Sequence, residues 1–202
     1  MSTPSHDYTG GARDVVTPSP AREAAPRVLA SAVGMLELTR RKRLHHPRGR
    51  VGRVIHFADG TSGRIYRETI VDEGVAADPA VLVVGFVLRG IHGRAHRAFR
   101  VESWLNTPLF VGFPGFTAKL WTAHDEHEVY RGFYEWDGAD RAASYVHALS
   151  WVLGLVCVPG SIRAHITVGV HSADALAHPE RLGPSGTGTE QWWRPLAPLS
   201  PR

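Results

Sequence analysis

Charged and aromatic residues alternate in the stretch 129–137, VYRGFYEWD. Because neighbouring side chains of a strand point to opposite faces, Arg131 and Glu135 share one face and Tyr134 lies on the other. A guanidinium and a carboxylate on one face can bind and activate a substrate anion, or they can form an ion pair that only stabilises the sheet. The residue types favour the structural ion pair and leave the catalytic alternative open.

Two histidines are candidate general bases, because an imidazole titrates near neutral pH. His165 lies in the strand-like stretch SIRAHITVGV, and His147 lies in the helix-like stretch ASYVHALSW. A lone histidine in either kind of element is more often a hydrogen-bonded structural residue. That second interpretation remains open for both residues.

A cationic floor is expected beneath a small-molecule cavity. Lys119 shares a strand face with Trp121 in FTAKLWTAHD, and Arg163 shares one with His165. A floor with more basic than acidic side chains suits a substrate that carries a carboxylate, a phenolate or an enolate. The predicted floor combines Lys119, Arg131, Glu135, Arg163 and His165.

Nothing in the sequence indicates a metal or another cofactor. His92 and His96 have the spacing of a metal pair on a helix, but no third ligand has suitable spacing, so a solvated basic face is expected there. No phosphate-binding glycine pattern, cysteine pair or nucleophile motif is present. The single cysteine, Cys157, has apolar neighbours and is expected to be an inert, buried thiol. We therefore expect chemistry without a bound cofactor.

A regular succession of elements positions these residues after residue 79. The continuous apolar run AVLVVGFVL is typical of a strand that is buried on both faces. Asp137 is the expected N-cap of the second helix, and Pro159 and Gly160 are expected to end it. Strands are predicted at 80–88, 116–125, 129–137 and 161–170, and helices at 92–106 and 141–156.

This order of elements predicts an α+β fold of the ferredoxin-like βαββαβ type, an antiparallel sheet with both helices on one face. The other face would expose large side chains, so its burial against a second copy predicts a homodimer. Residues 27–78 are an expected extension, with a helix at 28–45 and a β-hairpin that turns at Asp59 and Gly60. The α+β domain covers 79–171.

Two terminal segments, 1–26 and 172–202, are rich in Pro, Ser, Gly and Thr without periodicity. This composition predicts a disordered N-terminal tail and a flexible C-terminal tail. The adjacent Trp192 and Trp193 are an exception, because two indoles are costly to leave in water and can dock onto the domain or a partner.

The order of elements over residues 80–171, with GFPGF before the second strand, YRGFYEWDG in the third and VPGS before the last, resembles the dimeric α+β-barrel superfamily. That group includes antibiotic-biosynthesis monooxygenase-like proteins and haem-degrading monooxygenases. The resemblance covers a little under half of the chain and implies the ferredoxin-like fold and the dimeric barrel.

The same resemblance implies two sets of site residues. Its cofactor-free monooxygenases bind an acidic phenol with aromatic, Arg, His and Asn side chains in a cavity between the sheet and the helices, and the corresponding elements here contain Trp104, Asn106, Trp121, Tyr134 and His165. Haem-degrading members use a His on the second helix and an Asn in the first strand. His147 lies on the second helix here, but the first strand, AVLVVGFVL, has no Asn.

Composition limits the setting and the partners. With 202 residues, 43% of them hydrophobic, the chain can bury a substantial core. No apolar stretch reaches the ~20 residues that span a bilayer, and the first residues do not form a secretory signal, so a cytoplasmic protein without a membrane span is expected. The segment 40–53, RRKRLHHPRGRVGR, can meet an anionic surface or can be a solvated helix end, and nucleic acid is not an expected partner.

The expected function is that of a small-molecule enzyme of the cofactor-independent monooxygenase or cyclase kind, acting on an acidic aromatic or polyketide-like substrate. His165 or His147 would be the base, Arg131 or Arg163 would hold the anion, and the aromatic side chains would stack on the substrate. A non-catalytic dimeric protein that binds a ligand or haem, and an interaction protein that uses the segment 40–53, are the alternatives.

Overall fold

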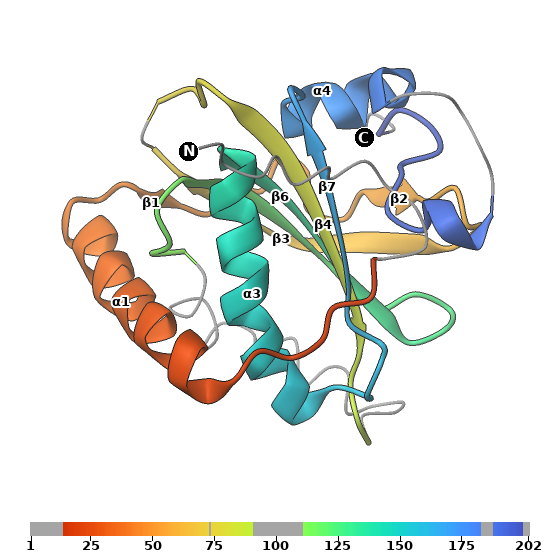
Figure 1. Ribbon diagram of the computed structural model, residues 1–202. Helices are drawn as coiled ribbons and strands as arrows, with labels where there is room; N and C mark the ends of the chain where they lie inside the picture. The colour runs from red at the N-terminus through yellow and green to blue at the C-terminus, as the bar shows by residue number, and fades with distance from the viewer. Residues whose placement is uncertain (1–13, 73, 91–110, 183–187, 200–202) are drawn as a thin grey trace, which may run out of the picture.

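The computed structural model describes residues 14–72, 74–90, 111–182 and 188–199, which form one antiparallel sheet with helices on it (Figure 1). The predicted helix at 92–106 lies outside these residues. The other predicted elements are present: β4 (Pro79–Val87), β5 (Phe116–Thr122), β6 (Val129–Asp137), α3 (Ala139–Val156) and β7 (Arg163–Val168). They follow β1 (Leu44–His45), β2 (Val54–His56) and β3 (Ser62–Val71) of the extension.

The sheet has the strand order β1-β3-β5-β6-β4-β7, and every pairing is antiparallel. The four predicted domain strands therefore occur as β5-β6-β4-β7, with the apolar β4 between two neighbours. The predicted hairpin is also present, because β2 pairs with β3 around Gly60, whose φ of 87° permits the tight turn. β3 continues the sheet beside β5.

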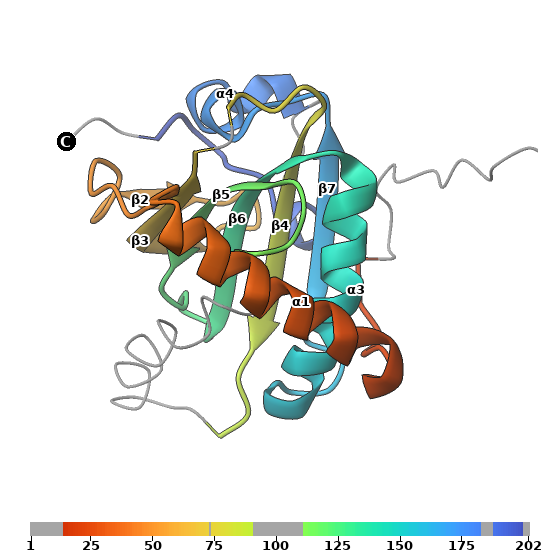
Figure 2. The same ribbon diagram turned by 90° about the vertical axis from the view of Figure 1, so that its left-hand side faces the viewer.

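One face of the sheet, which we call the helix face, packs against α1 (Ala21–Arg40) and α3. Figure 2 shows α1 outermost, lying across this side of the molecule. Leu82 and Val84 of β4, Trp121 of β5 and Tyr134 of β6 contribute its buried side chains. α1 begins seven residues before the expected start at 28, so residues 21–26 are helical and not part of a disordered tail.

The opposite face, which we call the second face, carries Val81, Val83, Leu120 and Phe133. It is covered by residues 172–182 and 188–199, which we call the C-terminal segment: α4 (Ser172–Ala177), two short 3-10 helices at Pro179–Leu182 and Thr189–Gln191, and the residues that follow. Trp192 is 3% exposed within this cover. The expectation that residues 172–202 form a flexible tail is wrong for the described part, because isolated apolar side chains dock it on the sheet.

This cover occupies the face that a second copy was expected to bury. The homodimer and the dimeric barrel stay predictions. Among the described residues, the C-terminal segment already buries the face on which the dimer prediction was based. Asp137 also differs from its expected role: its carboxylate accepts the N–H groups of Ala77 and Asp78 before β4, while Gly138 stands at the N-cap of α3. No helix in the described residues is long and apolar enough to cross a bilayer.

Candidate functional site

The predicted site residues lie on different faces of the sheet. Lys119 pairs with Tyr134 across β5 and β6, so these two residues and Trp121 lie on the helix face. Residues at alternate positions of β6 and β7 point to the second face, because they stand opposite Val81, Val83 and Gly85 of β4; they are Arg131, Glu135, Arg163 and His165. The predicted continuous floor is therefore wrong. Trp104 and Asn106 lie outside the described residues.

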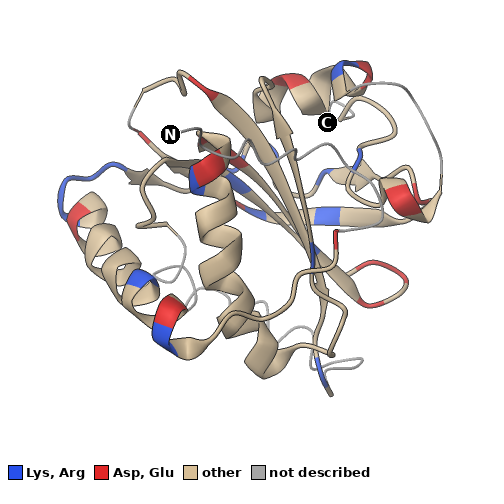
Figure 3. Cartoon of the chain, in the orientation of Figure 1, with Lys and Arg blue, Asp and Glu red and all other residues tan. Residues whose placement is uncertain are grey.

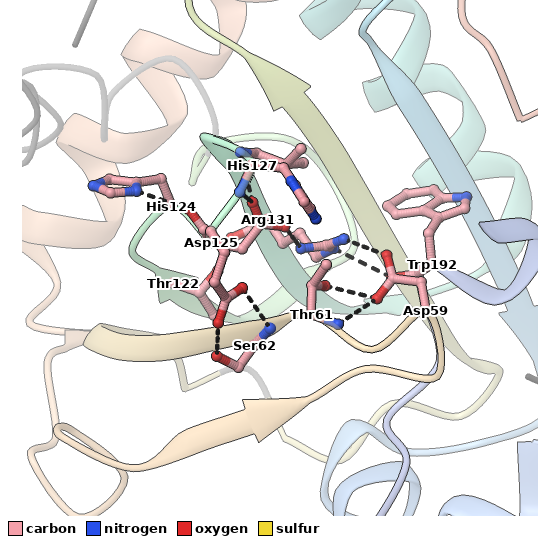
Figure 4. Close-up of polar contacts among 11 residues, drawn as sticks. Asp59, Thr61, Ser62, Thr122, His124, Asp125, His127, Arg131 and Trp192 are labelled. Atoms are coloured by element: carbon pink, nitrogen blue, oxygen red, sulfur yellow. Dashed lines mark hydrogen bonds and ion pairs between the residues drawn. The ribbon is translucent and has the colours of Figure 1, made fainter. Parts of the chain in front are cut away.

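Arg131 is held by acidic partners on the second face (Figure 4). Its guanidinium contacts the Asp125 carboxylate at 2.5 Å and the Asp59 carboxylate at 2.7 Å, and its Nε donates to the carbonyl of Trp192 at 3.2 Å. Asp125 also accepts the backbone N–H groups of the β5–β6 turn, from His127 and Val129. Arg131 thus joins two turns to the C-terminal segment. The predicted ion pair between Arg131 and Glu135 is wrong.

Glu135 has its own partners. Its carboxylate accepts the backbone N–H of Ser172 at 2.9 Å and the hydroxyl of Ser172 at 2.5 Å, and His171 Nδ1 lies 3.1 Å away. Burial acts to raise the pKa of Glu135, but the hydrogen bonds from Ser172 and His171 outweigh it and lower the pKa. Glu135 therefore fixes the start of α4 as an ionised acceptor.

His165 is enclosed between the two terminal segments. The indole of Trp193 stacks on its imidazole at 3.6 Å with an interplanar angle of 5°, and Asp14 lies 3.6 Å from its Nδ1. Asp14 in turn accepts the indole N–H of Trp192 at 2.9 Å. Arg163 lies 5.9 Å from the Trp192 ring. These contacts describe a packed structural histidine.

His147 lies on α3, where its contacts are with the chain before α1 and the first turn of α1. Its Nδ1 contacts the hydroxyl of Ser19 at 2.8 Å, and its Nε2 lies 3.5 Å from the Glu23 carboxylate. The imidazole thus fastens the chain before α1 to α3. Neither predicted base lies beside Lys119.

The helix face contains a buried group of cations and aromatic rings, which we call the cation–aromatic layer: Arg67, Lys119, Trp121, Tyr134 and Tyr145. Lys119 Nζ lies 3.2 Å from the centre of the Trp121 ring and 4.4 Å from that of Tyr134. The guanidinium carbon of Arg67 lies 3.8 Å from the Trp121 ring. Such contacts stabilise a cation through the electron-rich face of the ring.

Strand register assembles this layer. Arg67 stands opposite Trp121, and Lys119 stands opposite Tyr134. The next cross-strand neighbour of Trp121 is Gly132, and a Cβ there would lie 2.6 Å from the Tyr134 ring. A glycine at this position therefore lets the ring lie along β6.

Hydrogen bonds fix the rings of the layer. The Trp121 indole N–H donates to the hydroxyl of Thr69 at 3.1 Å, and the Tyr145 hydroxyl donates to that of Tyr134 at 3.1 Å. Burial raises the pKa of both tyrosines, so both hydroxyls stay protonated at neutral pH. These bonds hold the rings of Trp121, Tyr134 and Tyr145 in fixed positions.

The electrostatics of the layer centre on Lys119, which is 5% exposed. Burial, and after it the like charge of Arg67, holds the pKa of Lys119 well below its usual range. Burial also lowers the pKa of Arg67 to about 10, which leaves this guanidinium charged at neutral pH. The layer combines an amine whose charged form is disfavoured with a guanidinium that is charged at neutral pH.

Sequence analysis placed Lys119 and Trp121 correctly on one face of their strand. It grouped Lys119 with Arg131 and Glu135 instead of Tyr134, and it missed Arg67 and Tyr145. Arg67 lies in the hairpin that was assigned to an extension. The alternation of polar and apolar residues in GRIYRETIV predicts a strand but does not show that β3 pairs with β5. Tyr145 has the helical spacing of a core residue. No group of three or more His, Cys, Asp or Glu that could hold a metal is present among the described residues.

Two solved structures match parts of this chain. An anthrone oxidase-like protein matches with a TM-score of 0.38 and 12% identity, over 55% of this chain and 55% of that chain. A ferredoxin-fold protein from Listeria monocytogenes 4b F2365, related to antibiotic biosynthesis monooxygenases, matches with a TM-score of 0.37 and 15% identity, over 54% of this chain and 64% of that chain.

Both matches extend over about half of this chain. The match covers less than two thirds of the length of either structure. No protein-family model and no curated protein matches this chain. Similarity of this extent does not show a shared substrate.

Proposed function

We propose that this chain is a small-molecule enzyme that binds the anion of an acidic aromatic or polyketide-like substrate at the cation–aromatic layer. The observation that supports this proposal most directly is that two buried basic side chains, Arg67 and Lys119, lie against one indole ring. An anionic ligand would be attracted by both groups, and such an attraction is stronger at a buried site than in water.

The role of the base passes from histidine to Lys119 in this proposal. Burial holds the pKa of Lys119 well below the usual range, so its amine gives up a proton more readily than that of an exposed lysine. The amine would take the proton of a phenol or of the carbon between two carbonyls. The N–H bond forms as the O–H or C–H bond breaks, and Arg67 holds the resulting phenolate or enolate.

Two reactions of that anion fit the expected enzyme class. In a cyclase, the enolate carbon bonds to a carbonyl carbon of the same molecule, whose oxygen takes up the proton. In a cofactor-independent monooxygenase, the carbanion carbon would bond to dioxygen from solution to give a hydroperoxide. Loss of water would then leave one oxygen atom on the substrate as a carbonyl and release the other as water. Both need only deprotonation, orientation and a site shielded from water, which buried residues supply.

The test uses a hydroxynaphthoate and a 1,3-diketone as probes, with quenching of tryptophan fluorescence as the binding signal and dioxygen uptake and product mass as signals of turnover. We expect Arg67→Met and Lys119→Met to weaken binding at least tenfold. Lys42→Met is the matched control, because Lys42 is the other lysine of the chain and is exposed.

Three results would count against parts of this proposal. Unchanged binding in both layer variants would remove the site. Turnover that is lost in His165→Gln and kept in Lys119→Met would return the base to histidine. Binding without turnover of any probe would favour the alternative of a non-catalytic ligand-binding protein.

A further inference from the structure

α1 presents an apolar line to solvent. Leu29, Val33 and Leu36 are 68%, 70% and 67% exposed, and we call them the outer stripe of α1. Their spacing of four and three residues places them on one side of the helix. The opposite side of α1 buries Ala24, Val28 and Ser31. Figure 2 shows this helix as the outermost element of its side of the molecule.

Cations stand at both ends of the outer stripe. Arg22 and Arg40 continue its line by helical spacing, and Arg40–Arg43 form a basic turn at the helix end (Figure 3). Residues 21–43 contain six Lys and Arg and two Glu. The two carboxylates face cations of the same helix: Glu23 contacts Arg22, and Glu37 contacts Arg40 and Arg41. The surface therefore stays positive around an apolar centre.

A second copy of the chain fits this surface poorly. In an antiparallel pair of α1 helices Arg22 would approach Arg40, and in a parallel pair each arginine would approach its own equivalent, so like charges meet in both cases. Three aliphatic side chains also fall short of the roughly 800 Å² per partner that a stable interface buries. Nucleic acid would use the cations but leave the outer stripe in water.

We propose that α1 and its basic turn dock on a membrane surface that contains anionic lipids. An interfacial helix buries its apolar side at the boundary of head groups and acyl chains, while its cations contact the anionic head groups. The outer stripe supplies the first property, and the basic turn of Arg40–Arg43 supplies the second. The helix lies on the bilayer and does not cross it. This inference is independent of the proposed enzyme activity.

The experiment measures co-sedimentation of the full chain with large vesicles of phosphatidylcholine alone and of phosphatidylcholine with one quarter phosphatidylglycerol. We expect binding to the anionic vesicles to be at least tenfold stronger than to the neutral ones and to fall as salt rises, because the cations are exposed. Leu29→Gln/Val33→Gln should lower binding at least tenfold. Arg40→Gln/Arg41→Gln/Lys42→Gln should remove the preference for anionic lipid.

The matched control is Val168→Gln/Leu196→Gln, since these side chains are 58% and 56% exposed and lie outside α1. It should bind like the unchanged chain, and circular dichroism should show that all variants are folded. The proposal is overturned if the anionic vesicles bind no better than the neutral ones, or if the control loses as much binding as the stripe variant. Dimerisation that depends on Leu29 and Val33, without vesicle binding, would identify a second copy as the occupant instead.

Discussion

Removal of the Arg131 guanidinium tests whether this residue is structural. In Arg131→Met, the carboxylates of Asp125 and Asp59 lose their cation although their side chains are only 1% and 10% exposed. Loss of one member of a buried ion pair costs about 3–5 kcal/mol, because the remaining charge stays in a poorly solvated place. At about 2–4 °C per kcal/mol for a chain of this length, the melting temperature should fall by roughly 10 °C.

The assay is denaturant unfolding together with calorimetry, and Arg141→Met is the control. Arg141 also pairs with an aspartate, Asp137, at 3.1 Å, but its side chain is 54% exposed. An exposed pair contributes about 0.2–1 kcal/mol, so the control should lose little stability. Equal losses in the two variants would show that burial does not govern these ion pairs.

A double-mutant cycle then identifies the partner of Arg131. Arg131→Met and Asp125→Asn should show a coupling of at least about 1 kcal/mol, because the two side chains share a buried contact. Arg131→Met and Glu135→Gln should add within about 0.5 kcal/mol, since Glu135 bonds to Ser172 and His171 instead. A large coupling to Glu135, or a loss below about 1 kcal/mol in Arg131→Met itself, would refute the reasoning.

Three further changes follow from buried contacts. The pKa of Lys119 is lower in the folded chain than in the unfolded chain, for which it is about 10.5. Between these two pKa values the unfolded chain binds more protons, so the unfolding free energy should rise with pH by up to about 1.4 kcal/mol per pH unit. Titrating the unfolding free energy should show this rise weakened in Lys119→Met and kept in Lys42→Met. Trp192→Ala should cost about 3–5 kcal/mol in denaturant unfolding, because it opens a cavity and removes the bond to Asp14; a loss under 1 kcal/mol would mean that the C-terminal segment contributes little. Gly85→Ala should lower the melting temperature, since its Cβ would lie 2.8 Å from the Trp192 ring, and Gly85→Ala/Trp192→Ala should then lose less than the sum of the two single changes.

Local patterns in the sequence were sufficient for most of the fold. The apolar run of β4, the alternation of β6 and the Asp-Gly turn before β3 each act over a few residues, and all three appear where expected. The cover of the second face depends instead on isolated side chains such as Leu176 and Trp192, which have no periodicity. Composition predicted a flexible tail there because the composition of a segment does not show where its single apolar residues pack.

Side-chain partners were harder to predict than strands. Arg131 finds Asp59, 72 residues away in the sequence, only because the turn before β3 and the β5–β6 turn meet beside β6. Arg67 reaches Trp121 through the pairing of β3 with β5, which no local pattern reveals. Faces within a strand could be assigned by alternation, whereas the faces of different strands could be related only once their register was known.

The contacts of Trp192 on the second face are the reason for placing the proposed small-molecule site on the helix face. Its ring lies over Gly85 of β4, its N–H is accepted by Asp14 near the start of the described chain, and its carbonyl accepts the guanidinium of Arg131. Three distant parts of the sequence thus specify one position for this indole. A ligand at the second face would have to displace those contacts together. On the helix face, by contrast, Arg67 and Lys119 already lie against an aromatic ring, so a bound anion would add to contacts that the fold has made.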